Sequence, residues 1–354
     1  MTVPDSFLAA VVPEPGAANV VANRSCSALD AGEVAIKITA TAINPVDWKA
    51  RDYWQFFKGL LSEYPAVFGS DAAGEVVAIG PNVSTVAVGD RVFFQGMLGK
   101  YDSCTFQQYC KMPAALVSKT PANISDDQAA GVSLALVAGV TAFYDAQGYA
   151  LAPPWDREGP QAGKGKAVVI IGGASSVGQY AIQLARLSGF EKIVTNASPA
   201  NHDLLRQLGA HVVLDRSQST PEAFQTAIGG LPLAFIFDAI SAEATQDLGV
   251  DIHRAMGTTA GLVLTVNPAA TKRGESDPRV EINMVLGLGS SLALRYLSEP
   301  MVKHLGGEDG YLARGLIVPN RVRVVPGGLG AVEQALGLNK AGVSGEKLIV
   351  RPFE

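Results

Sequence analysis

The sequence predicts an α/β fold of two domains, in which a β-rich domain is interrupted by a domain built on a doubly wound parallel sheet. Three observations indicate this class. Short strands with glycine and proline turns fill the first third of the 354 residues. A strict alternation of apolar strands and helices begins near residue 167, and the pattern of the β-rich first third returns near the C-terminus. We expect the β-rich domain at residues 1–125 and 300–354 and the parallel-sheet domain at residues 126–299.

The first third contains segments typical of short antiparallel strands. Residues 33–42 alternate apolar and polar side chains, which is the period-2 pattern of a half-buried strand. Residues 67–80 form a second pattern, a strand pair punctuated by glycines. In residues 88–94 a turn dipeptide precedes a strand. Together these segments predict a barrel-like antiparallel domain.

The character of the sequence changes at Ser125, a plausible N-cap for a helical pattern that covers residues 126–149. A loop rich in proline and glycine follows at 151–164. Residues 167–171 are then continuously apolar, as expected for a parallel strand buried on both faces. Further helices are expected at 177–188, 201–208 and 330–340, and further strands at 192–195, 211–214, 234–238, 261–266, 322–325 and 347–351.

Composition argues for a globular enzyme and against several other classes. Apolar residues make up 48% of the chain, and the net charge of −5 gives no case for nucleic acid or an anionic membrane as a partner. The longest uncharged stretches are shorter than a membrane-spanning helix requires, and no signal layout opens the chain, so we expect a cytoplasmic protein. The four histidines and three cysteines have no ligand spacing, so no metal site is expected, and Cys104 and Cys110 read as packing thiols.

A glycine-serine turn covers Gly172–Gly178, between the strand at 167–171 and the helix that follows. Small residues let the backbone approach a pyrophosphate, and a helix N-terminus offers amide donors and positive potential. Ser175 replaces the middle glycine of the usual spacing, but the hydroxyls of Ser175 and Ser176 can also bond phosphate oxygens. This context favours a Rossmann dinucleotide site over a glycine-rich turn in some other α/β protein.

The segment after the second strand of this domain indicates which dinucleotide is bound. Sites that prefer NAD usually carry an acid there, which grips the ribose diol. Residues 195–201 contain no acid, whereas Ser198 and Asn201 can donate hydrogen bonds to a 2′-phosphate and Arg216 can add charge. We therefore expect NADPH; the alternative is an ordinary polar loop with a solvated arginine.

Five segments in order along nearly the whole chain resemble the quinone oxidoreductase branch of the medium-chain dehydrogenase/reductase superfamily. They are Ala42-Ile-Asn-Pro-Val-Asp-Trp-Lys49, Gly69-Ser-Asp-Ala-Ala-Gly74, Val88-Gly-Asp-Arg-Val92, the Gly172–Gly178 turn and Ser344-Gly-Glu-Lys-Leu-Ile-Val350. Within that branch the chain is most similar to fungal trans-acting enoyl reductases of the lovastatin type, which serve polyketide synthases in secondary metabolism.

The resemblance implies a GroES-like catalytic domain joined to a Rossmann domain. Zinc-dependent members have a histidine after the glycine where this chain has Ser70 and Asp71, and the other zinc ligands are also absent here. Without a Lewis acid an alcohol has no obvious means of activation. Reduction of an activated C=C bond needs less, because the conjugated carbonyl draws electrons while hydride adds at the β-carbon. The resemblance therefore implies a zinc-independent enoyl or quinone reductase.

The resemblance also assigns site residues. Cofactor-binding positions are Val46, Asp47, Trp48, Lys49, Ser175, Ser176, Val177, Gly178, Ser198, Pro199, Ala200, Asn201, Arg216, Val266, Asn267, Val343 and Ser344. The substrate wall is Gly139, Val140, Thr141, Ala142, Phe143, Tyr144, Asp145, Leu286 and Gly287. Arg216 departs from the family, where relatives often have tyrosine.

Lys49 is the candidate catalytic or orienting group, because the family places it near the nicotinamide ribose; the alternative is a surface lysine. Tyr53, Tyr144 and water are rival proton sources. Asp47 and Asp71 are expected to stabilise local structure rather than to perform chemistry.

The leading hypothesis is an NADPH-dependent enoyl reductase that acts on a carrier-bound unsaturated thioester, with a polyketide synthase as partner. One alternative is a reductase of free quinones or small enones, and a second is a non-catalytic relative that binds nucleotide or protein. Many relatives dimerise through the region of residues 281–294, but its glycines and serines make a poor edge strand. We therefore expect a monomer, with a homodimer as the alternative.

Overall fold

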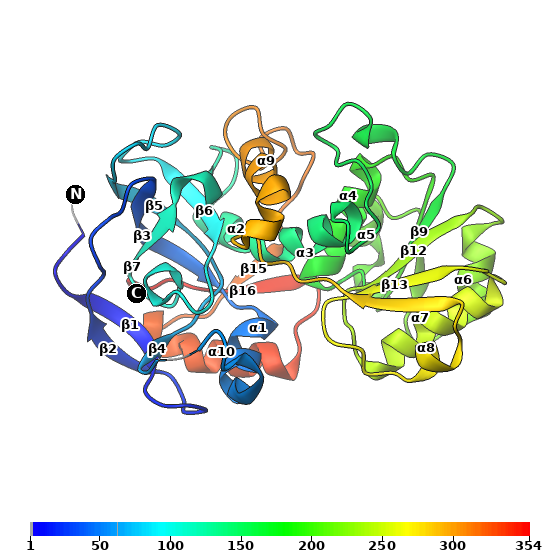
Figure 1. Ribbon diagram of the computed structural model, residues 1–354, viewed down its shortest axis with the longest axis horizontal. Coiled ribbons are helices and arrows are strands. Elements are labelled where there is room, and N and C mark those ends of the chain that lie inside the picture. The colour runs from blue at the N-terminus through cyan, green and yellow to red at the C-terminus, as the bar shows by residue number, and fades with distance from the viewer. Residues whose placement is uncertain (1–2, 62) are drawn as a thin grey trace. The chain divides into compact units, whose positions relative to one another are not determined.

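The computed structural model describes residues 3–61 and 63–354, and the chain divides into two compact units. Unit 1 is Met1–Leu134 with Ser298–Glu354, and unit 2 is Ala135–Leu297. The chain passes into unit 2 within helix α3 (Ser133–Tyr144) and returns to unit 1 within α9 (Arg295–Leu305) (Figure 1). The predicted α/β class, with one β-rich part and one parallel-sheet part, is confirmed.

The described residues of unit 1 form two sheets and, besides short 3-10 helices, three α-helices that lie wholly within the unit. The smaller sheet has the order β2-β1-β4, and the larger has the order β15-β16-β3-β5-β6-β8, with β7 paired to β3. Its strands are β1 (Phe7–Val12), β2 (Val20–Arg24), β3 (Glu33–Ala42), β4 (Ala66–Val67), β5 (Asp71–Ile79), β6 (Arg91–Gln95), β7 (Tyr109–Pro113), β8 (Val117–Lys119), β15 (Arg321–Val324) and β16 (Glu346–Val350). Its helices are α1 (Pro45–Asp52), α2 (Asp126–Ala130) and α10 (Val332–Ala341).

Alternation of side chains along β3 directs Ile36 and Ile38 into the core, as the sequence predicts. The two strands expected within residues 67–80 are β4 and β5, which belong to different sheets. Gly74 lies inside β5 because a Cβ there would sit 2.1 Å from the carbonyl oxygen of Lys37 on β3. A glycine can therefore mark a close approach of two backbones instead of a turn.

Unit 2 is a six-stranded parallel sheet of order β11-β10-β9-β12-β13-β14. Chain order reverses between β9 and β12, and ligands of such sheets bind outside the carboxyl ends of the strands at this point. The strands are β9 (Ala167–Ile171), β10 (Lys192–Ala197), β11 (Val212–Asp215), β12 (Leu233–Asp238), β13 (Gly261–Thr265) and β14 (Val280–Met284). The helices are α4 (Ser176–Leu187), α5 (His202–Leu208), α6 (Pro221–Ile228), α7 (Glu243–Ala255) and α8 (Arg273–Ser276).

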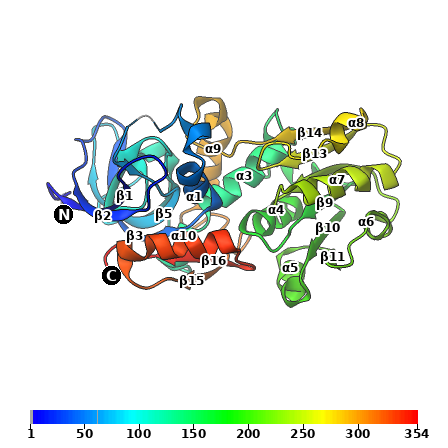
Figure 2. The ribbon, with the colours of Figure 1, turned by 90° about the horizontal axis from the view of Figure 1, so that it is seen from below.

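Helices cover both faces of the unit 2 sheet, with α6 and α7 on one face and α4 and α5 on the other (Figure 2). Every residue of β9 is buried, as its continuous apolar sequence predicts. Phe224 of α6 and Val250 of α7 pack against Val169 of β9 in the core under the first face. The strand that leads into the phosphate-binding candidate is thus held rigidly from both sides.

Two expectations about local structure need correction. The helix expected over residues 126–149 is two helices, α2 and α3, because Gly131 and Val132 form a turn between them. The aliphatic stem of Lys347 occupies the space beside Gly131, where a Cβ would lie 2.8 Å from Lys347 Cγ. In addition, the helical pattern ends at Tyr144, the last residue of α3, and not at residue 149. Ser125 is confirmed as an N-cap, since its hydroxyl accepts from the Gln128 amide at 3.2 Å.

Across the described residues, none of the helices combines the length and the apolarity that crossing a bilayer requires.

Candidate functional site

The turn at Gly172–Gly178, called the phosphate turn below, joins the carboxyl end of β9 to the start of α4. Gly172 adopts a φ of +78°, which permits the sharp change of direction. Ser175 is the N-cap of α4, and its Oγ accepts from the Gly178 amide at 3.0 Å. The hydroxyl therefore orders the helix end, and its proton remains available for donation to an anion.

Two glycines of the phosphate turn leave room for close backbone approach. A Cβ on Gly173 would lie 2.2 Å from Thr195 Oγ1, and a Cβ on Gly178 would lie 2.4 Å from the Gly172 carbonyl oxygen. Larger residues would force the turn away from the sheet and open it. The result is a narrow loop of small residues ahead of a twelve-residue helix, which fits a nucleotide pyrophosphate.

The carboxyl end of β10 carries the residues predicted to recognise a 2′-phosphate. Asn201 is buried and donates through Nδ2 to Ser198 Oγ at 3.1 Å, so the Ser198 hydroxyl is free to donate its own proton elsewhere. Arg216 is exposed, and its amide donates to the Ala197 carbonyl at 3.0 Å, which holds it beside the end of β10. The structure thus brings Ser198, Asn201 and Arg216 to one edge of the unit 2 sheet.

An acid does stand beside this edge, although it lies outside residues 195–201. Asp215 ends β11 opposite Ala197. Its Oδ1 accepts from the amide and the hydroxyl of Ser217, at 3.0 and 2.9 Å, and these bonds lower the Asp215 pKa. The carboxylate therefore caps its own turn.

Asn196 is a residue of this region that the sequence analysis missed. Its Oδ1 accepts from the Gly172 amide at 2.9 Å, and its Nδ2 donates to Ser219 Oγ at 3.0 Å. The side chain thereby ties the phosphate turn to the loop after β11. An asparagine at the end of a strand gives no sequence signal for such a link.

The predicted contacts Val266 and Asn267 follow β13 and are bonded to the loop after β12. The Val266 amide donates to Ser241 Oγ at 2.8 Å, and Asn267 Nδ2 donates to the Ile240 carbonyl at 3.3 Å. Ser241 has a φ of +58°, a left-handed conformation that is rare outside glycine and is held here by its neighbours. Asp238 accepts from the amides of Ile240 and Ser241 and completes this support.

Most of the predicted substrate wall lies on α3 and faces the interior of unit 2. The ring of Phe143 packs edge-on against Phe235, with centroids 4.9 Å apart. The hydroxyl of Tyr144 shares a 2.8 Å hydrogen bond with Ser188 Oγ. A Cβ on Gly287 would lie 2.9 Å from Ala138 Cα, so the Leu286–Gly287 segment does run beside α3.

Helix α1 in unit 1 carries the predicted contacts Val46 to Lys49. The Lys49 ammonium lies 5.6 Å from the centre of the Trp48 ring, and partial burial lowers the Lys49 pKa. Trp48 Nε1 donates to Asn339 Oδ1 of α10 at 2.9 Å. Lys49 is thus a half-buried amine in an aromatic environment, unlike an ordinary surface lysine.

A group of buried polar residues lies at the start of α1, and we call it the buried polar cluster. It consists of Asn44, Asp47, Ser70, Asp71 and Lys347. Asp47 accepts from Ser70 Oγ and from the Asn44 amide, both at 2.8 Å, and burial raises its pKa to about 7. Lys347 donates to Asn44 Oδ1 and lies 3.9 Å from Asp71 Oδ2. Burial raises the Asp71 pKa and lowers the Lys347 pKa.

The described residues show no grouping of side chains typical of a zinc site. Ser70 and Asp71 are bonded within the buried polar cluster, and no three His, Cys, Asp or Glu side chains of the described chain are grouped as ligands. Cys104 and Cys110 are buried, and burial raises both thiol pKa values, that of Cys104 to about 12.

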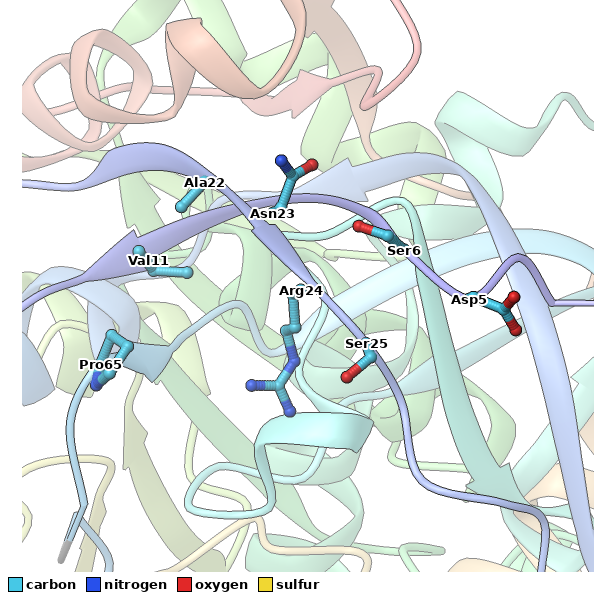
Figure 3. A pocket seen from close by; sticks show the side chains of 8 residues that line it. All are labelled: Asp5, Ser6, Val11, Ala22, Asn23, Arg24, Ser25 and Pro65. Atoms are coloured by element: carbon cyan, nitrogen blue, oxygen red, sulfur yellow. The ribbon is translucent and has the colours of Figure 1, made fainter.

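A pocket of about 490 Å³ opens on unit 1 beside β1 and β2, away from the predicted site residues (Figure 3). Figure 3 shows Asn23 and Arg24 pointing to opposite faces of β2. The Arg24 guanidinium in this pocket is paired with Asp102. The other polar residues that line the pocket are Asp5, Ser6, Asn23 and Ser25, and none of them belongs to the predicted site.

The fold and the phosphate turn together define a two-domain dehydrogenase. Residues 30–122 match the model of the alcohol dehydrogenase GroES-like domain, and residues 176–273 match that of the zinc-binding dehydrogenase family. The trans-enoyl reductase himH of Aspergillus japonicus is 31% identical over 325 residues, which are 90% of this chain and 89% of the relative. The enoyl reductase component lovC of the lovastatin nonaketide synthase of Aspergillus terreus is 31% identical over 344 residues, 92% of this chain and 91% of the relative.

Among solved structures, the Escherichia coli quinone oxidoreductase in complex with NADPH has the same fold. It superposes with a TM-score of 0.69 at 19% sequence identity and covers 98% of this chain and 100% of its own. The chain belongs to the medium-chain dehydrogenase/reductase superfamily, in the family of the fungal trans-enoyl reductases. It is an oxidoreductase, as the reductases among these relatives indicate.

Proposed function

We propose that this protein is an NADPH-dependent enoyl reductase that reduces the C=C bond of an α,β-unsaturated polyketide thioester carried by a synthase. The phosphate turn carries the proposal, because it pairs a close-packed glycine loop with a capped helix end. The full-length similarity to trans-enoyl reductases supports the reaction class. The name of the lovastatin relative, a component of a synthase, supports a polyketide synthase as partner.

NADPH is proposed over NADH because of the groups at the end of β10. The exposed Arg216 and the Ser198 hydroxyl can both donate to a 2′-phosphate, whereas Asp215 is already bonded to Ser217. The Asp215 carboxylate stays ionised because these bonds lower its pKa, and the nearby positive charge of Arg216 offsets its repulsion of the phosphate. The arrangement therefore favours the phosphorylated cofactor.

When bound, NADPH supplies the hydride that adds to the β-carbon of the substrate. The residues of the chain bind the cofactor and orient the reacting groups. The phosphate turn holds the pyrophosphate of the cofactor. Ser241 fixes the loop that carries Val266 and Asn267, which are proposed to contact the cofactor. Lys49, half-buried on α1, is proposed as the orienting group. Because the Tyr144 hydroxyl is bonded to Ser188, Tyr53 and water are the simpler proton donors to the α-carbon.

We further propose that the protein acts as a monomer. The predicted dimer region contains β14, which ends at Met284 and is the last strand of the unit 2 sheet. Residues 285–289 continue without strand structure, so the edge available for pairing is short. Sedimentation of the purified protein alone tests whether it is a monomer. Sedimentation of the protein together with a polyketide synthase tests the partnership.

The experiment that tests the proposed function compares two substrates at fixed enzyme concentration. NADPH oxidation is followed by absorbance with a short α,β-unsaturated acyl thioester and with a free quinone. We expect turnover of the thioester with NADPH and much slower turnover with NADH. Turnover of the quinone alone would replace the enoyl assignment, and turnover of neither would overturn the enzymatic proposal.

A further inference from the structure

Lys347 is a charged residue that the proposed function does not use. It lies on β16 in the Ser-Gly-Glu-Lys-Leu segment, and its side chain is 4% exposed. Its ammonium donates to Asn44 Oδ1 and lies 3.9 Å from Asp71 Oδ2. Burial of an ammonium group costs several kcal/mol unless partners compensate. The buried ammonium group of Lys347 is therefore stabilised by the polar groups around it, and it stabilises them in turn.

The surroundings of Lys347 contain two fully buried acids from separate elements. Asp47 is on α1, and Asp71 opens β5. Asp71 also accepts from the Leu134 amide at 3.1 Å, at the start of α3. One buried cation thus faces two buried carboxyl groups, and each member restricts where the others can lie.

Lys347 joins the two segments of unit 1 that are predicted to contact the cofactor. Asn44 immediately precedes α1, which carries Val46 and Lys49. Val343–Ser344 are separated by one residue, Gly345, from β16, which carries Lys347. The main chain reinforces this link, since the Ile43 amide donates to the Leu348 carbonyl at 3.0 Å. The start of α1 is therefore fixed to β16 by one main-chain hydrogen bond, from Ile43 to Leu348, and by one side-chain hydrogen bond, from Lys347 to Asn44.

The far end of α1 is held by contacts of a different kind. Arg51 bonds to Glu333, and Asp52 bonds to Lys340, both on α10. The side chains of Glu333 and Lys340 are 42% and 52% exposed, so water screens these pairs. The buried polar cluster is thus the firmer of the two attachments of the helix.

We propose that Lys347 is a positioning residue, which holds the start of α1 so that Lys49 keeps its place for the reaction. The inference rests on the proposed function, in which Lys49 is the orienting group. Loss of Lys347 frees Asn44 Oδ1 and leaves two carboxyl groups without their cation. The helix start then moves, and Lys49 moves with it.

The test compares Lys347→Met with Lys119→Met, a matched control that removes an exposed lysine paired with Asp90 in the same unit. For Lys347→Met we expect kcat with the unsaturated thioester to fall about tenfold to a hundredfold, since a shift of about 1 Å has that effect. The Kd for NADPH is expected to weaken by a smaller factor than kcat falls, because the predicted contacts of α1 are disturbed while the phosphate turn of unit 2 is intact. The control is expected to keep both constants.

A second readout does not depend on turnover. Competitive labelling of amines, resolved by peptide mass spectrometry over a pH range, measures the pKa of Lys49. Partial burial lowers it in the wild type. We expect it to rise toward its ordinary value in Lys347→Met, because α1 is released, and to stay unchanged in Lys119→Met.

If Lys347→Met fails to fold, the double variant Lys347→Met/Asp71→Asn replaces it, because it removes one buried carboxyl together with the cation. The double variant is expected to fold and to show the same tenfold to hundredfold lower kcat relative to the wild type. Wild-type kcat and wild-type Lys49 pKa in a folded variant would overturn the positioning role. A wild-type protein that turns over no substrate would overturn the proposed function instead, while the Lys49 titration would still decide the positioning role.

Discussion

The phosphate turn and the buried polar cluster are two ordered polar regions built in opposite ways. The turn consists of seven consecutive residues of unit 2, and it uses backbone amides, small residues and one capping hydroxyl. The cluster consists of side chains from separate elements of unit 1, and its central bond joins residues 303 positions apart in the chain. The turn is proposed to receive a charged ligand, whereas the charged groups of the cluster have partners within it.

This difference decides what could be predicted from the sequence. A strand, a glycine turn and a helix in succession identify the phosphate turn, because all of its determinants are local. Ser175 was predicted as a phosphate ligand, and the structure adds its role as the helix cap. Lys347 could not be assigned, because no spacing relates residue 347 to residues 44 and 71. The sequence indicates only that a lysine stands in an otherwise apolar strand, and this does not show which residues it contacts.

The largest effect is expected when a substitution disturbs the backbone of the phosphate turn. In Gly178→Ala the new Cβ would meet the Gly172 carbonyl oxygen at 2.4 Å, so the turn must open. We expect the NADPH Kd to weaken about a hundredfold, equal to about 3 kcal/mol, measured by titration calorimetry. Gly337→Ala in α10, where no heavy atom lies within 4 Å, is the control and should bind normally. Unchanged binding by folded Gly178→Ala would contradict a phosphate role for the turn.

The cluster is expected to give the protein a pH-dependent stability that the turn does not. In the folded state the Asp47 pKa is about 7, above its ordinary 3.8. Between these values the folded state keeps a proton that the unfolded state has lost, so the free energy of unfolding falls as pH rises. The slope reaches about 1.4 kcal/mol per pH unit for one proton.

Urea unfolding at several pH values from 4 to 8 measures this slope. Asp47→Asn is expected to reduce the slope, because an amide does not titrate in this range, and to leave the contribution of Asp71, whose pKa is also raised by burial. Asp203→Asn, at a side chain that is 92% exposed, is expected to keep the wild-type slope. An equally steep slope in Asp47→Asn would assign the pH dependence to other groups.

Cofactor choice should depend on the edge beside the turn. Arg216→Ala removes a charge proposed to face the 2′-phosphate, and the ratio of kcat/KM for NADPH over NADH is expected to fall about tenfold. Arg206→Ala on α5, which removes an exposed arginine paired with Asp203, is the matched control and should keep the ratio. A ratio unchanged in Arg216→Ala would leave Ser198 as the group to examine.

The smallest effect is expected at the exposed end of α1. Lys340→Met removes an ammonium that lies 2.7 Å from Asp52 with its side chain half exposed. We expect the free energy of unfolding to fall by less than about 0.5 kcal/mol, since exposed pairs are weak. Loss of the buried Lys347 is expected to cost several times more. Equal losses at the two ends would contradict the view that the cluster is the firmer attachment.

The most direct test of the central proposal follows the hydride itself. NADPH carrying deuterium at the transferred position of the nicotinamide is incubated with the enzyme and an α,β-unsaturated acyl thioester, and the product is analysed by mass spectrometry and NMR. The proposal predicts one deuterium, at the β-carbon of the saturated thioester. A saturated product without deuterium at that carbon, or no saturated product, would contradict it.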